Sequence, residues 1–272
     1  MATETKLIVL LLLALNYHEC LGKLLTEKFS SCPSKVYNND LHADNAVEID
    51  VDPNVVREIF SDYKDDIKPY LNTSKSTEDF CLVTPYNPET RTWQTNDDKV
   101  RSDMKWYSVK NFKTYERYRR HVERLDIKKL FKGTWIDDDI TIYSMFFLVR
   151  SHCEEHHMHV DWSGGVHTQV VTVLIPLKDF GINLAYKDVD DNVQHYDYKF
   201  GKAIGVSGGF LHSTDIGHSD PEDVLLCIYL GSSDPTIWEY AQDAIADELQ
   251  YYMSPFDGFV RNQEFPRKRI CQ

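Results

Sequence analysis

The sequence has little positive charge and no apolar segment long enough to cross a membrane. Its 272 residues include 30 Lys and Arg against 43 Asp and Glu, which gives a formal net charge of −13. Nucleic-acid binding requires a surplus of Lys and Arg facing the phosphates, so we expect no nucleic-acid partner. The apolar run at residues 7–15 is much shorter than the roughly 20 residues that a spanning helix needs, so we expect no stable membrane span.

The same short run has the features of a secretory signal peptide. Lys6 precedes it, and a polar segment with small residues follows as far as Gly22. We therefore expect residues 1–22 to be a signal peptide, and the mature protein to be secreted or to stay in the lumen of the secretory pathway. The tripeptide Asn72-Thr73-Ser74 then makes Asn72 a glycosylation candidate.

Cysteine is scarce, and no two cysteines have the C-x-x-C spacing of redox and zinc motifs. Five cysteines remain after residue 22, and an oxidising compartment allows two disulfides and one free thiol. The spacing does not determine the pairing. Cys227 lies in an apolar run, so we expect it to be the buried free thiol.

The chain has no internal repeat, and its pattern changes near residue 140. Residues 23–139 are predicted to form a helical and irregular region that packs on the rest. Helices are expected after Asp52-Pro53 and over residues 107–131, with apolar side chains at helical spacing. A last helix is predicted over residues 235–253, because Asp234-Pro235 supplies an N-cap and a proline at the first position.

From residue 140 onward, short apolar runs alternate with turn signals. Eight strands are predicted, over residues 140–149, 157–162, 169–176, 183–186, 193–200, 203–206, 209–213 and 224–230. No gap between them is long enough for the crossover helices of a parallel sheet, so an antiparallel sandwich or barrel is favoured. The predicted fold class is α+β, with a jelly-roll core in residues 140–272 and packing helices at both ends.

Three residues in this region are suited to binding one metal ion. His159 and Asp161 are two residues apart, so on a strand both side chains point to the same face. His212 follows 53 residues later, in a second predicted strand. Two histidines and one carboxylate form the facial triad of non-haem Fe(II) oxygenases, which leaves open coordination positions. We therefore predict a metal site formed by His159, Asp161 and His212.

These motifs resemble those of the Fe(II)/2-oxoglutarate-dependent oxygenases, in particular the prolyl-4-hydroxylase-like branch. The resemblance rests on His159-Val160-Asp161, on Gly209-Phe210-Leu211-His212 and on the strands around them, over about a third of the chain. It implies a double-stranded β-helix, Fe(II) on the three residues, and 2-oxoglutarate and O₂ as co-substrates. It also implies hydroxylation of a protein, peptide or small molecule. His157 and Trp162 would line the pocket.

One feature of the resembled family is missing. That family usually has an Arg or Lys some ten residues after the second histidine, where it binds a carboxylate of 2-oxoglutarate. This chain has no Lys or Arg between Lys202 and Arg261, and Asp223 has the opposite charge. Arg150 is the leading substitute because it ends an apolar strand beside the histidines. The other candidates are Tyr143, Tyr186, Lys187, Lys199 and Lys202.

The sequence also offers four alternatives. The protein could be a non-catalytic jelly-roll module, cupin-like or lectin-like, or an isomerase or dioxygenase that needs no 2-oxoglutarate. The segment from His152 to His156 matches the H-x-x-E-H pattern of a zinc peptidase family, but it lies between strands and not on a helix. Residues 205–209 match the G-x-S-x-G pattern of hydrolases, but a turn between strands explains them better.

Overall fold

The computed structural model describes residues 45–73, 75–83, 102–162, 169–179 and 181–262. All of them belong to one compact unit, Val36–Gln272. Within the described residues, no helix has the length and apolar character needed to pass through a bilayer. The predicted signal peptide lies outside the described residues.

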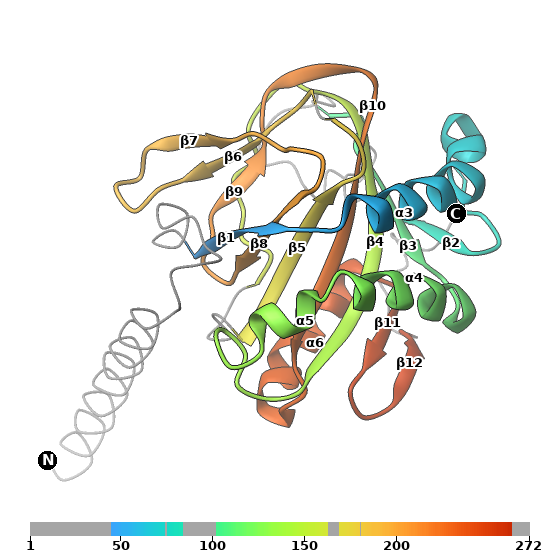
Figure 1. The fold of residues 1–272 in the computed structure, drawn as a ribbon, viewed down its shortest axis with the longest axis vertical. Coiled ribbons are helices and arrows are strands. Elements are labelled where there is room, and N and C mark those ends of the chain that lie inside the picture. The colour runs from blue at the N-terminus through green and yellow to red at the C-terminus, as the bar shows by residue number, and fades with distance from the viewer. Residues whose placement is uncertain (1–44, 74, 84–101, 163–168, 180, 263–272) are drawn as a thin grey trace, which may run out of the picture. The chain divides into compact units, whose positions relative to one another are not determined.

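A seven-stranded antiparallel sheet forms the centre of the fold (Figure 1). Its strand order is β1-β8-β5-β10-β4-β3-β2. The strands are β1 (Ala46–Asp50), β2 (Phe80–Val83), β3 (Lys105–Val109), β4 (Ile140–Cys153), β5 (Val170–Pro176), β8 (Lys202–Ser207) and β10 (Gly217–Ser232). The longest pairing joins β10 to β4, and it places Cys227 opposite Phe146 and Asp223 opposite Arg150.

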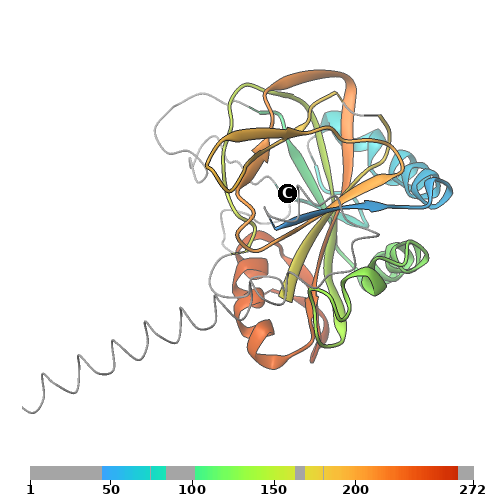
Figure 2. The same ribbon diagram turned by 60° about the vertical axis from the view of Figure 1, so that its left-hand side comes forward.

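A smaller antiparallel sheet has the order β7-β6-β9. Its strands are β6 (Leu184–Lys187), β7 (Val193–Tyr196) and β9 (His212–Thr214). A separate hairpin, β11 (Tyr251–Ser254) and β12 (Gly258–Arg261), follows the last helix. The turned view in Figure 2 shows the small sheet on one side of the large sheet, with the blue α3 (Pro53–Asp66) and the green α4 (Phe112–Arg124) on the other side.

The helices begin where the sequence supplies capping side chains. Asp52 accepts a hydrogen bond from the backbone N–H of Asn54 at the start of α3 (Pro53–Asp66), and Asn111 accepts one from Thr114 at the start of α4 (Phe112–Arg124). Asp234 caps α6 (Pro235–Glu248) in the same way. Two short helical elements complete the set, η1 (Lys68–Thr73) and α5 (Ile127–Phe131).

Successive residues of β4 point to the two faces of the large sheet. Phe147 packs against Tyr63 of α3 and Tyr118 of α4, with ring centroids 5.6 and 5.3 Å apart. Phe146 faces the other way and packs on Trp106 and on other side chains of the core beneath the small sheet and α6. Because both faces are covered by apolar groups, β4 is buried along most of its length, as its nearly unbroken apolar sequence predicts.

The structure confirms the predicted fold class, an α+β fold with an antiparallel jelly-roll core and flanking helices. Several element predictions were wrong. Strands β1, β2 and β3 join the large sheet, although residues before 140 were expected to be helical or irregular. The last helix ends at Glu248 and not at residue 253. Residues 157–162 form no regular strand, and only His159 makes a β-bridge there, to His212.

The cysteines differ in part from the expectation. Cys227 is a buried free thiol, as predicted, but Cys153 is a buried free thiol as well. Cys81 is disulfide-bonded. With Cys153 free, the five cysteines after residue 22 cannot form two disulfides, so that prediction was wrong.

Candidate metal centre

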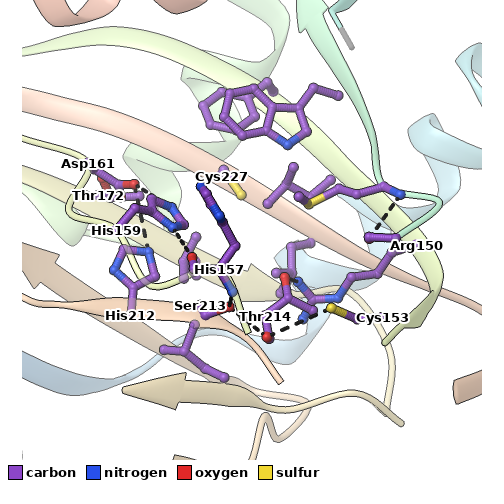
Figure 3. Close-up of a pocket in the computed structure, with 18 of the residues that line it drawn as sticks. Arg150, Cys153, His157, His159, Asp161, Thr172, His212, Ser213, Thr214 and Cys227 are labelled. Carbon is purple, nitrogen blue, oxygen red and sulfur yellow. Dashed lines mark hydrogen bonds and ion pairs between the residues drawn. The ribbon is translucent and has the colours of Figure 1, made fainter. Parts of the chain in front are cut away.

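His159, Asp161 and His212 converge on one point, and their ligand atoms all lie within 4.8 Å of one another. Asp161 Oδ1 is 3.6 Å from His159 Nε2 and 3.7 Å from His212 Nε2. Figure 3 shows the two imidazole rings side by side, with the carboxylate above them. Among the described residues this is the single group with the donor atoms and spacing to hold a metal ion.

Backbone pairing brings the two histidines together. His159 N–H donates to the carbonyl oxygen of His212 at 2.8 Å, and His212 N–H donates back to His159 at 2.9 Å. On the other side of His212, β9 pairs with β6 and places Tyr186 opposite His212. Directly opposite residues in an antiparallel pair point to the same face, so both imidazoles face the interior between the two sheets.

The hydrogen bonds of the two rings select the nitrogen that faces the site. His159 Nδ1 lies 2.8 Å from the carbonyl oxygen of His157, and His212 Nδ1 lies 3.0 Å from that of Phe210. A carbonyl oxygen only accepts, so each Nδ1 carries the proton and donates it there. In the neutral form of each ring, Nε2 therefore keeps a lone pair, which is the form of histidine that binds a metal.

The Asp161 carboxyl is kept ionised although it is nearly buried. Burial alone raises the pKa of Asp161, but the attraction of His212 and His159 and a hydrogen bond from Thr172 outweigh it, so the pKa lies below its usual value. Burial lowers the pKa of His212, which favours the neutral ring. For His159 the effect of burial is exceeded by the attraction of Asp161, and its pKa is raised. The site thus combines a carboxylate with nitrogen donors.

Trp162 and Thr172 support the Asp161 carboxylate from behind. The Trp162 indole N–H donates to Thr172 Oγ1 at 3.0 Å, and the Thr172 hydroxyl hydrogen-bonds Asp161. Trp162 is 3% exposed and packs on Tyr229. Trp162 therefore lies behind the ligands and is not among the side chains that line the cavity. Thr172 was not identified from the sequence, because a threonine in a strand carries no signal of its own.

A cavity of about 150 Å³ opens beside the three ligands, between the large and small sheets. His157 lines it, as the sequence predicted, although its place in a catalytic site stays a prediction. Most of the remaining wall is apolar. Its larger apolar side chains are Trp106, Phe146, Leu148, Leu174, Leu184 and Leu225. Such a wall excludes water, so the orientation of a bound molecule depends on a few polar groups.

Arg150 supplies the positive charge in this cavity. It is 3% exposed, and its guanidinium donates to Thr214 Oγ1 at 2.6 Å and to the carbonyl oxygen of Ile182 at 3.2 Å. The Tyr198 hydroxyl oxygen lies beside the Arg150 guanidinium, which can donate to it. Arg150, Tyr198 and Thr214 all line the cavity, and Figure 3 shows Arg150 at the end away from His159 and His212. Tyr198 was missed, since aromatic residues in strand-like segments are mostly core.

The other predicted anion-binding candidates lie elsewhere. Lys187 pairs with Asp191 at 2.9 Å, Lys202 pairs with Asp50 and Glu48, and Lys199 is exposed. None of these lysines lines the cavity.

The tyrosine candidates and Asn72 are also away from the cavity wall. The Tyr143 hydroxyl donates to the carbonyl oxygen of Ser232, and Tyr186 stacks on Phe210, which in turn stacks on His212. Asn72 is exposed on η1, where its glycosylation stays a prediction.

The two competing motifs do not have the geometry of their families. His152 lies in β4 and His156 beyond its end, so the H-x-x-E-H segment is not on a helix. Ser207 ends β8 and is followed by a turn, so the G-x-S-x-G segment lacks the helix of a hydrolase elbow. Both alternatives are therefore excluded.

No family model and no curated protein matches the sequence. Solved structures match its fold. AviO1 from Streptomyces viridochromogenes Tue57 has a TM-score of 0.51 at 11% identity, over 72% of this chain and 96% of that chain. The non-heme alpha ketoglutarate dependent carbocyclase SnoK from nogalamycin biosynthesis has a TM-score of 0.52 at 11% identity, over 76% and 86%. The epimerase SnoN of the same biosynthesis has 0.51 at 10%, over 71% and 80%. The chain thus shares the fold of such proteins.

Proposed function

We propose that the protein is an Fe(II)- and 2-oxoglutarate-dependent oxygenase, and that it hydroxylates its substrate in the secretory pathway. The observation that carries this proposal is the convergence of two histidine Nε2 atoms and one nearly buried carboxylate at the end of an apolar cavity. This donor set suits Fe(II) and leaves coordination positions open. Bound iron would supply the O₂ chemistry, and 2-oxoglutarate its reducing electrons. SnoK and SnoN, which share the fold, are named as alpha ketoglutarate dependent enzymes.

Arg150 is the group that we assign to the far carboxylate of 2-oxoglutarate. This dicarboxylate would reach the metal with its 2-oxo acid end and would need a cation for its other end. A buried carboxylate without such a partner is costly. Arg150, with Tyr198 and Thr214 beside it, provides a charge and two hydroxyl groups in the same cavity. Cys227 lines the same cavity.

The rest of the cavity suits the reacting part of a substrate. Trp106, Phe146 and Leu148 present apolar surface to the cavity, which would orient a carbon–hydrogen bond and keep bulk water away. His157 contributes a polar edge at this wall. The substrate would be a protein, peptide or small molecule, and the signal-peptide pattern at residues 1–22 supports a secretory location.

The deciding experiment is an anaerobic Fe(II) titration of the mature protein with and without 2-oxoglutarate, on wild type and His212→Ala. The proposal requires a visible charge-transfer band that needs both additions and is lost in the variant. Metal binding that ignores 2-oxoglutarate would instead favour a metal-binding jelly-roll module. No metal binding at all would remove the metal site itself.

A further inference from the structure

The segment that carries His159 and Asp161 is attached to the sheets at few points. In the part of this segment that the structure describes, the backbone pairs with β9 only at the bridge between His159 and His212. The N–H of His157 adds one bond, to the Ser213 hydroxyl at 2.7 Å. A ligand pair on such a segment needs side-chain contacts on both sides to hold its position, because coordination geometry tolerates only small displacements.

Side-chain contacts flank the ligand pair. After Asp161, the buried Trp162 is anchored through its indole N–H. Before His159, the Nε2 atom of His156 lies 2.8 Å from Asp215 Oδ1. His156 precedes His159 by three residues and Asp215 follows His212 by three, so the antiparallel register of the bridge brings them opposite each other.

Asp215 also connects this contact to the small sheet. Its second carboxylate oxygen lies 2.7 Å from His195 Nδ1 on β7, and its first accepts the backbone N–H of Ile216 at 2.8 Å. The Asp215 side chain is 15% exposed and that of His156 is 25% exposed. Both oxygens of one carboxylate thus connect three separate segments around the ligands.

We propose that His156 and Asp215 are positioning residues that set the metal affinity of the His159–Asp161–His212 site. They form a clamp that keeps the segment before His159 against β9, in the arrangement where the Nε2 atoms converge. His195 fixes the orientation of Asp215 from the other side. The inference rests on the metal site of the proposed function, and it needs no 2-oxoglutarate.

A second metal site at this cluster explains the geometry less well. Among the described residues, only His159, Asp161 and His212 bring three ligand atoms within 4.8 Å of one another. His156 and His195 instead hold opposite oxygens of Asp215, with ring centroids 6.4 Å apart. A carboxylate that contacts two histidine rings in this way links the two segments that carry those rings.

The test compares Co(II) binding by wild type, His156→Leu and His156→Gln in the full mature chain. Co(II) is stable in air, and its visible ligand-field band reports the coordination geometry. Gln can place a donor N–H where His156 Nε2 stands, whereas Leu fills similar space without a donor. Asp188→Asn is the matched control, since Asp188 makes several hydrogen bonds in the β6–β7 turn and none to the clamp.

We expect His156→Leu to weaken Co(II) binding about tenfold and to alter the ligand-field band at saturating metal, because supporting contacts around metal ligands typically contribute about 10- to 100-fold. His156→Gln and Asp188→Asn should stay within about threefold of wild type. Equal affinities and spectra for the Leu and Gln variants would overturn the clamp, even if both melt earlier. Wild type that binds no Co(II) would also overturn it. A wild type that binds Co(II) but shows no 2-oxoglutarate-dependent band would remove only the proposed function.

Discussion

Replacing Arg150 with methionine tests the assignment of the 2-oxoglutarate anchor. Methionine keeps an unbranched apolar stem and removes the guanidinium. Because Arg150 is 3% exposed, little water can replace the lost charge around a bound carboxylate. Removing one partner of a buried, hydrogen-bonded charge pair costs about 2–4 kcal/mol. This corresponds to about 30- to 1,000-fold weaker binding of 2-oxoglutarate. Arg150→Lys keeps the charge but loses the planar pair of N–H donors that can bind both oxygens of a carboxylate. We therefore expect an intermediate loss of 2-oxoglutarate affinity.

The assay is a 2-oxoglutarate titration at saturating Fe(II) without O₂, followed by the charge-transfer band. Fe(II) affinity in the absence of 2-oxoglutarate should stay near that of wild type, since Arg150 is not a ligand. Lys187→Met serves as control, because Lys187 pairs with Asp191 on the β6–β7 hairpin and does not line the cavity. Unchanged 2-oxoglutarate affinity in folded Arg150→Met, or equal losses in both methionine variants, would refute the assignment.

Three further substitutions test neighbouring parts of the argument. Tyr198→Phe removes one hydroxyl from the Arg150 end, so the 2-oxoglutarate Kd should rise about tenfold in the same titration. Gly205→Ala places a methyl group 2.6 Å from the Phe131 ring, and we expect a cost of about 1–3 kcal/mol, measured as a lower urea midpoint. Burial raises the pKa of the Asp79 carboxyl, but hydrogen bonds from Asn111 and Thr114 lower it by more. The net effect is a pKa below the usual value for Asp. Its stabilisation is therefore present above about pH 4 and lost on acidification, and Asp79→Asn should flatten the acid decline in Tm.

The three candidate metal ligands could be predicted because their residue types and their spacing are visible within short stretches of the sequence. His159 and Asp161 are two residues apart, and His212 lies in a second apolar segment. The expectation that a strand places His159 and Asp161 on one face was only partly right, because residues 157–162 form one bridge and not a strand. What keeps both side chains on one face is the bridge to β9 together with the contacts on either side, and such contacts depend on distant residues.

The strands before residue 140 were missed for a related reason. β1 consists of Ala46–Asp50, whose apolar residues were too few to distinguish a strand from irregular chain. Its partner, β8, lies more than 150 residues later, and pairing with a buried edge decides its conformation. β3 precedes α4 by three residues, so its apolar side chains merged with the helical pattern that follows. The first residues of helices were better predicted, where a capping side chain such as Asp234 marks the start.

The absence of Lys and Arg on β10 does not leave the cavity without a cation, because Arg150 supplies the charge from the adjacent strand. Asp223 stands where the resembled family carries its cation, and Arg150 is its direct partner on β4. Asp223 is fully buried and accepts the N–H groups of Gly181 and Ile182, and the carbonyl oxygen of Ile182 accepts from Arg150. The acid therefore holds the turn that orients the arginine. A cation on the adjacent strand, with an acid that positions its support, places the charge within the same cavity, and this is why we propose Arg150 and not a surface lysine as the anchor.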